Sequence, residues 1–139
     1  MDEIIEIQIP ANPRYLKLIR KFVSNICEMV NFSNKQCNRI TLAIDEACTN
    51  IIRHAYGGAT DQPIILKTII LEDRIRFVLR DFGKKANLDS IQSRQLDEVR
   101  PGGLGVHLIK SVMDTFELKH VQTGNELILE KYFSITKEA

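Results

Sequence analysis

The sequence predicts an α/β (α+β) fold with two layers, in which three helices cover one face of a mainly antiparallel, mixed sheet. Two observations support this prediction: strand-like segments occur in pairs joined by short turns, and three other segments carry apolar residues at helical spacing. Hairpins pair their strands antiparallel, and three helices can cover only one face of a sheet. We therefore expect the other face to be partly solvated.

The composition fits a single domain over residues 1–139. Of the 139 residues 44% are hydrophobic, which is enough for a core without disulfides or metal ions. Nineteen basic and eighteen acidic residues leave a net charge of +1, so no global field favours direct binding of nucleic acid or of a membrane. The three cysteines lie in apolar helical patterns, and no signal peptide or membrane span is visible, so we expect a reduced, cytoplasmic protein.

The first thirty residues predict an edge strand and a helix. Between Ile5 and Ile9 every second residue is isoleucine, which is the period of a half-buried strand, and Pro10 ends it. Pro13 then begins a segment that repeats apolar residues at helical spacing as far as Val30, with basic residues on its other side. An exposed edge strand of this kind invites pairing with another chain.

The stretch 40–58 predicts the helix around which the rest of the chain is organised. Ser33 and Gln36 form a capping box before it, and Gly57 and Gly58 supply a left-handed stop after it. One face of this helix is apolar, through Ile40, Ile44, Ala47, Ile51 and Ala55. This face is wide enough to pack on a core.

The second half of the chain predicts two hairpins with a loop and a helix between them. Residues 64–80 and 115–133 each predict two strands around a short turn, and Ile75, Phe77 and Leu79 alternate in the second strand of the first pair. Residues 83–101 lose all periodicity, and a loop of this length in a compact domain is often a lid or a binding loop. The glycine-rich residues 102–105 then open a helix over residues 106–113.

Three clusters of residues have a spacing that suits ligand chemistry. Glu46 and Asn50 lie one turn apart on the central helix, so a carboxylate and a carboxamide point into the same small volume. Asp81 ends a strand, and Gly83 behind it lets the backbone come close to a planar ligand. The glycine run 102–105 begins a helix, where free N–H groups and the positive end of the helix dipole attract phosphate.

Each cluster also has a structural interpretation. A glutamate and an asparagine at this spacing are often solvated, an aspartate can simply end a strand, and a glycine run can be a flexible loop end. Arg53 and His54 either face a bound phosphate or interact with the dipole at the helix end, and Tyr56 is interpreted as a packing residue. In favour of function, all three clusters lie at element ends or beside the long polar loop, where binding residues concentrate.

Two familiar motifs are excluded. Asp81-Phe82-Gly83 spells the magnesium motif of eukaryotic-type protein kinases, but the chain lacks their catalytic-loop pattern and is too short for two lobes. The glycine run matches neither the dinucleotide-binding fingerprint nor the P-loop, and it does not directly follow a strand.

Taken together, the three clusters resemble those of the Bergerat-type ATP-binding fold, which gyrase, sensor histidine kinases and mismatch-repair ATPases share. Within that fold the chain looks most like the small anti-sigma-factor serine kinases, and the resemblance covers nearly the whole chain. The segment DEACTNIIRHAY resembles the N box of that family, RDFG resembles its first glycine box, and RPGGLGVHLIKSVMD resembles its second.

The resemblance implies a role for each cluster. Glu46 would be the general base that activates the attacking hydroxyl, and Asn50 would bind Mg²⁺. Asp81 would accept a hydrogen bond from the adenine amino group, and Gly83 would leave room for the purine. The backbone around the ATP phosphates would be freed by three glycines, Gly102, Gly103 and Gly105.

The resemblance also assigns the long loop and shows two departures. Residues 83–101 would form the ATP lid, and Arg100 at its end would either reach the γ-phosphate or remain a solvated loop cation. Two lysines stand at 84–85, where many members of the wider superfamily continue with a further glycine. The dipeptide Gly124-Asn125 stands where they often have serine or threonine, and we assign it no nucleotide role.

The resemblance predicts an ATP- and Mg²⁺-dependent protein serine kinase that is also an anti-sigma factor and regulates transcription. Its partners would be an anti-sigma-factor antagonist of the STAS type and an RNA polymerase sigma factor. The exposed first strand and the resemblance together predict a homodimer. The alternative is an ATP-regulated protein-binding module that transfers no phosphate, in which lid closure alters the partner surface.

Overall fold

One antiparallel sheet forms the first layer of the fold. The computed structural model describes residues 2–87 and 103–133. In the described residues the sheet has five strands in the order β1-β2-β3-β5-β4, and every neighbouring pair is antiparallel. The strands are β1 (Glu3–Pro10), β2 (Pro63–Ile70), β3 (Arg74–Asp81), β4 (Thr115–His120) and β5 (Asn125–Tyr132). The first strand lies at an edge, as its sequence predicts.

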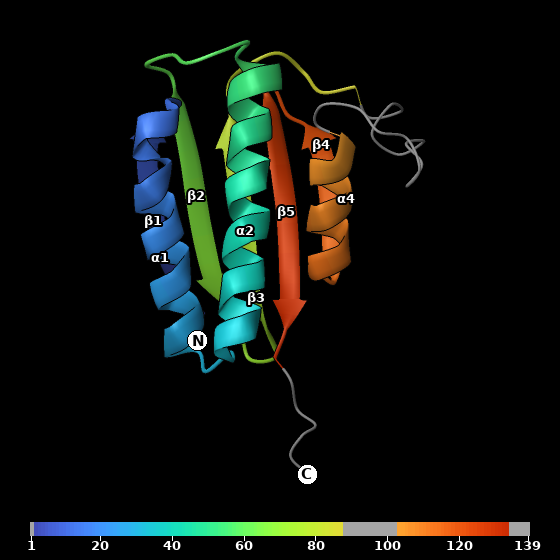
Figure 1. Cartoon of the computed structure of the whole chain (residues 1–139). Helices are drawn as coiled ribbons and strands as arrows, with labels where there is room; N and C mark the ends of the chain where they lie inside the picture. Colours follow the sequence, from blue (N-terminus) through green and yellow to red (C-terminus); the bar gives the residue numbers. More distant parts are fainter. Residues whose placement is uncertain (1, 88–102, 134–139) are drawn as a thin grey trace.

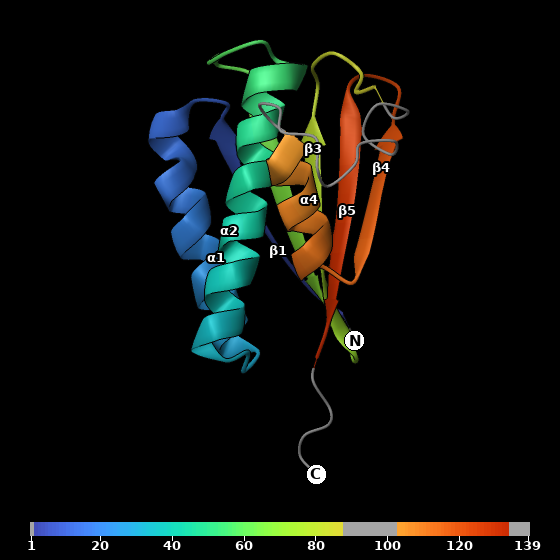
Figure 2. The same ribbon diagram turned by 45° about the vertical axis from the view of Figure 1, so that its right-hand side comes forward.

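The helices form the second layer on one face of this sheet (Figure 1). They are α1 (Leu16–Met29), α2 (Asn34–Asn50) and α4 (Gly103–Val112), with the short turns η1 (Pro13–Tyr15) and η2 (Ile51–Ala55). Figure 2 shows α2 between α1 and α4, over the middle of the sheet. The predicted two-layer α/β fold is therefore confirmed. Within the described residues, no helix is long and apolar enough to cross a membrane.

The two faces of the sheet differ in burial, because successive residues of a strand point to opposite faces. On the face under the helices, Leu66, Phe77 and Leu129 are fully buried. On the opposite face Lys67 is exposed, and the side chain of Ile4 keeps 59% of its surface exposed. Burying one face while leaving the other in contact with water is the usual arrangement of an antiparallel sheet.

The central helix begins where the sequence predicts and ends differently. Both halves of the capping box are present, since Gln36 N donates to Ser33 Oγ at 3.1 Å and Ser33 N donates to Gln36 Oε1 at 3.1 Å. After Asn50 the α-helix widens into the π-helical turn η2, in which Tyr56 N donates to Ile51 O at 3.0 Å. Turns of this kind are frequently found at functional sites. The chain then leaves through Gly57 at φ 73°, the predicted left-handed stop.

Two smaller features refine the sequence prediction. Pro13 begins the 3₁₀ turn η1, capped by Asn12, and the α-helix proper starts only at Leu16. The three cysteines are free and buried, as expected, and burial raises the pKa of the Cys27 thiol to about 12. A buried thiol of this kind behaves as a small apolar side chain.

Candidate functional site

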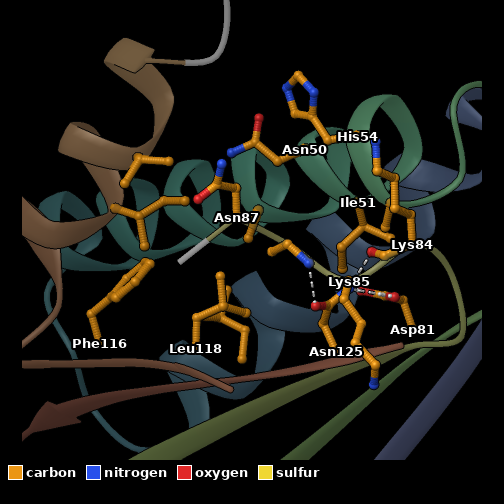
Figure 3. Close-up of a pocket in the computed structure, with 16 residues that line it drawn as sticks. Asn50, Ile51, His54, Asp81, Lys84, Lys85, Asn87, Phe116, Leu118 and Asn125 are labelled. Carbon is orange, nitrogen blue, oxygen red and sulfur yellow. Dashed lines mark hydrogen bonds between the residues drawn. The ribbon is translucent and has the colours of Figure 1, made fainter. Parts of the chain in front are cut away.

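A pocket of about 440 Å³ opens between the end of α2, the helix α4 and the sheet. Its apolar wall comes from both layers and includes Ile51, Ile109, Phe116, Leu118 and Leu127. Its polar groups are Asn50, His54, Asp81, Lys84, Lys85, Asn87 and Asn125. Figure 3 shows Asp81 and Asn125 facing each other at one side, with Asn50 and His54 projecting from the helix above. A largely apolar pocket with a few convergent polar groups is typical of a ligand site.

Asp81 lies at the end of β3 and is held by donors. Its side chain is 3% exposed, and its Oδ1 accepts hydrogen bonds from Gly83 N at 2.9 Å and from Asn125 Nδ2 at 3.1 Å. Asn125, the first residue of β5, also donates to Lys84 O at 2.9 Å. Its Oδ1 accepts from Ala86 N at 2.8 Å. Asp81 therefore presents a fixed acceptor to the pocket.

Gly83 is packed against the end of the central helix. A Cβ at this position would lie 2.6 Å from the backbone carbon of Ala55, which no real side chain tolerates. The adjacent Lys84 N donates to Ala55 O at 2.7 Å. The structure therefore provides a first reason for this glycine, which is the close approach of two backbone segments. Its predicted contact with a purine stays a prediction.

Asn50 is the second predicted site residue that lines the pocket. Its Oδ1 is buried and has no hydrogen-bond partner among the residues that the structure describes. Leaving a buried polar atom unpaired costs about 1–3 kcal/mol, so such an atom calls for an explanation. A ligand or a metal ion that supplies the missing partner is one.

Glu46 lies one turn before Asn50 on α2, outside the residues that line the pocket. It packs against the first turn of α4, where a Cβ on Gly105 would lie 2.6 Å from Glu46 Cδ. The structure therefore brings Glu46 and Gly105 together, beside the pocket that holds Asn50 and Asp81. Gly105 makes room for this carboxylate, an explanation that the sequence alone did not provide.

The remaining predicted residues are only partly described. Gly103 is the first residue of α4, so the glycine run leads into a helix as expected. Arg100, Gly102 and most of the predicted lid at 83–101 lie outside the described residues.

Sequence reasoning missed two polar residues around Asp81. Asn125 was interpreted only as a turn residue, and Tyr56 only as a packing residue. The Tyr56 hydroxyl donates to Pro63 O at 2.7 Å and accepts from Phe82 N at 2.8 Å, and burial raises its pKa above the ordinary 10.0. Asn125 can be recognised as a neighbour of Asp81 only once the register of β3 on β5 is known, because this register places the two residues opposite each other.

The electrostatics of the pocket favour an anion beside a neutral ring. Lys84 and Lys85 line it next to the apolar wall, and the ammonium of Lys85 donates to Val121 O in the turn between β4 and β5, so Lys84 is the cation considered for the pocket. In the described residues no group of three or more His, Cys, Asp or Glu side chains could hold a metal ion unaided.

Comparison with known proteins gives consistent results. Residues 9–131 match the family described as histidine kinase-like ATPase domain. A serine-protein kinase RsbW of Listeria monocytogenes is 30% identical over 142 residues, which cover 96% of this chain and 90% of the relative. The serine-protein kinase RsbW of Bacillus subtilis is 26% identical over 140 residues, which cover 95% of this chain and 87% of the relative.

A solved structure shares the fold. The crystal structure of the RsbU and RsbW domains of a Mycobacterium tuberculosis protein matches with a TM-score of 0.68 and 14% identity, over 93% of this chain. This chain spans 32% of that longer chain. At this identity the likeness concerns the fold alone.

Proposed function

Because this chain belongs to the family of histidine kinase-like ATPase domains and, within it, to the serine-protein kinases named RsbW, we propose that it is an ATP- and Mg²⁺-dependent protein serine kinase. One observation carries the proposal furthest. Asp81, a fixed acceptor, and Asn50, whose buried oxygen has no partner among the described residues, line the same pocket at separate places. The amino group on the base of ATP is a donor that suits Asp81, and the triphosphate binds a metal ion that suits the oxygen of Asn50.

The adenine ring lies against the apolar wall in this proposal. Asp81 accepts a hydrogen bond from the amino group of the base, and Phe116 and Leu118 cover the ring. The phosphates extend toward the first turn of α4, where the backbone at Gly102, Gly103 and Gly105 wraps them. Residues 83–101 act as the lid, with Arg100 on the γ-phosphate.

The residues present fit a magnesium ion. The carboxamide oxygen of Asn50 is a hard, neutral ligand, and its lack of a partner among the described residues matches a position that a cation completes. The ion, when bound, neutralises charge on the phosphate oxygens. Lys84 adds positive charge at the same pocket.

Glu46 acts as the general base in this proposal. Its carboxylate lies at the first turn of α4, next to the expected place of the terminal phosphate. It accepts the proton of a serine hydroxyl while the serine oxygen bonds to the γ-phosphorus. The bond between that phosphorus and the bridging oxygen breaks, and ADP leaves. Positioning and charge stabilisation supply most of the catalysis of such a transfer.

The protein substrate and partners follow from family membership in this proposal. The phosphate acceptor is a STAS-type anti-sigma-factor antagonist, and the chain also sequesters an RNA polymerase sigma factor, which regulates transcription. We further propose that residues 1–139 form one domain that works as a cytoplasmic homodimer.

Labelled ATP tests the kinase activity. The chain is incubated with Mg²⁺, ATP labelled in the γ-phosphate and a purified STAS-type antagonist, and the antagonist is then analysed for phosphoserine. We expect label on a serine of the antagonist, and none when the kinase or Mg²⁺ is left out. If ATP binds but no label is transferred to any antagonist of this class, the chain is an ATP-regulated binding module instead.

A further inference from the structure

The end of β3 and the start of β5 lie close together at the pocket. Asp81 and Asn125 are directly opposite each other in the register of these strands, and each is only 3% exposed. Gly124, just before Asn125, has φ 83°, and a Cβ there would lie 2.6 Å from Phe82 Cα. A glycine is required at this point, and the close approach that it permits brings the Asn125 amide onto the Asp81 carboxylate.

The orientation of the Asn125 amide is fixed by its partners. Its Oδ1 accepts from Ala86 N at 2.8 Å, and its Nδ2 donates to Lys84 O at 2.9 Å and to Asp81 Oδ1 at 3.1 Å. A flipped amide would place oxygen against the Asp81 carboxylate and NH₂ against the Ala86 N–H. Both contacts would be repulsive, so the amide can only present its donors to Asp81.

The orientation of the Asn125 amide determines which hydrogen-bonding groups Asp81 offers to a ligand. Oδ1 accepts from Gly83 N and from Asn125, whereas the described contact of Oδ2 is a longer one to Asn125 Nδ2, at 3.4 Å. All these partners are donors. Asp81 is therefore held in place as an acceptor, with capacity left on Oδ2 for one more donor.

We propose that Asn125 is a positioning residue that sets the base specificity of the nucleotide site by holding Asp81 as a fixed acceptor. The inference rests on the proposed function, in which Asp81 meets the base of ATP. A purine with an amino group at position 6 offers a donor to this acceptor, whereas a 6-oxo purine offers a second acceptor. A site built around a hydrogen bond rejects strongly an analogue that lacks the matching group.

Asn125 also anchors the chain segment that forms this part of the pocket wall. It binds the backbone of Lys84 and Ala86, and both of these residues line the pocket. On the other side of the same residue, His120 Nε2 lies 2.7 Å from Ala86 O. Figure 3 shows the Asn125 amide between this segment and Asp81. Loss of the amide would thus free both the carboxylate and the wall beside it.

Calorimetric titration with ATP and with inosine triphosphate tests the proposal, because these nucleotides differ only in the group at position 6 of the purine and in the hydrogen that the 6-oxo form carries on N1. The measured quantity is the ratio of the two affinities, in Mg²⁺, for the wild type, Asn125→Ala and Asn125→Thr. We expect Asn125→Ala to lower the preference for ATP by about tenfold to a hundredfold, the effect of a lost hydrogen bond to a charged group. Asn125→Thr keeps one O–H donor for Asp81 and should therefore retain part of the preference for ATP.

The controls separate specificity from folding. Asn38→Ala makes the same substitution at an exposed position of α2 and should leave the ratio unchanged. If Asn125→Ala does not fold, the ratio for Asn125→Thr must still fall below that of the wild type. An unchanged ratio in folded Asn125 variants that bind ATP would overturn the inference alone. A wild type that binds neither nucleotide would overturn the proposed function together with it.

Discussion

The two ends of the pocket differ in how their polar groups are satisfied. At the base end, defined by Asp81 and Asn125, the carboxylate and the amide bind each other and the neighbouring backbone. At the proposed phosphate end, which Asn50 lines and beside which Glu46 and Gly105 lie, a buried carboxamide oxygen has no partner in the described part of the chain. Among the described residues, the polar groups at the base end are thus already held by protein partners, and the Asn50 oxygen at the phosphate end is not.

The difference has a physical meaning for binding. Groups that are already held in place lose little entropy when a ligand arrives, so the base end can provide affinity and selectivity. An unpaired polar atom carries a cost that a ligand removes, so the phosphate end responds to what is bound. Each of the following substitutions affects one end and should leave the other intact.

The largest effect is expected for phosphoryl transfer in Glu46→Gln. Loss of a general base typically lowers the rate about 10²–10⁴-fold, and the substitution retains size and hydrogen bonding. ATP affinity should stay close to that of the wild type, because Glu46 does not line the pocket. Transfer of label to the antagonist measures the rate, and Glu28→Gln, on the exposed side of α1, is the matched control. Transfer at the normal rate would refute the role of Glu46.

Asp81→Asn should weaken ATP binding by roughly tenfold to a hundredfold, because a hydrogen bond to a charged group is lost. The new amide would also face the donors of Gly83 and Asn125, which need an acceptor. Calorimetry measures the affinity, and Asp61→Asn in an exposed loop is the control. If Asp81→Asn and Asp61→Asn bound ATP with equal affinity, the proposed contact between Asp81 and the base would be refuted.

Alanine substitutions at Gly83 and Gly105 should differ in their effect on the stability of the protein. A Cβ on Gly83 would meet the backbone of Ala55, which cannot move aside, so Gly83→Ala should cost about 1–3 kcal/mol of unfolding free energy. A Cβ on Gly105 would meet the end of the Glu46 side chain, which can move. Gly105→Ala should therefore keep its stability and lose phosphoryl transfer. Chemical denaturation and the labelling assay measure these outcomes, and equal losses of stability would contradict the comparison.

The smallest effect is expected for Tyr56→Phe, which leaves Pro63 O and Phe82 N without a partner. This should lower the stability by about 1–2 kcal/mol. Burial raises the pKa of Tyr56 above 10.0, so the folded protein keeps a proton that the unfolded chain loses. Stability should therefore fall as pH rises above 10, and this part of the decline should be absent in Tyr56→Phe. Tyr132→Phe, at a side chain that is 44% exposed, is the control for denaturation curves at pH 8 and above.

The fold was predictable because local patterns determine it. The alternation in β1 and β3 and the helical spacing in α1 and α2 are each readable within a few residues. The π-helical turn η2 was not, and at its end Ala55 O accepts a hydrogen bond from Lys84 N, far along the chain. Tertiary contacts of this kind leave no periodic signal.

For the candidate site, the sequence indicated two residues that line the pocket, Asn50 and Asp81, but not the geometry around them. Glu46, Asn50 and Asp81 were identified from their spacing and from the family resemblance. The role of Asn125 depends on the register that places it opposite Asp81, 44 residues earlier in the chain. The two glycines were expected to face a ligand, but Gly83 is packed against Ala55 and Gly105 against Glu46. Such close contacts are visible only in three dimensions.

The most direct test of the two-ended site is the magnesium dependence of ATP affinity in Asn50→Ala and Asp81→Asn. Each variant and the wild type are titrated with ATP by calorimetry, once with Mg²⁺ and once with a chelator. We predict that Asn50→Ala loses the gain in affinity that Mg²⁺ provides and matches the wild type in chelator, whereas Asp81→Asn is weaker under both conditions. A wild type without any gain from Mg²⁺, or an Asn50→Ala variant that keeps the full gain, would contradict the account.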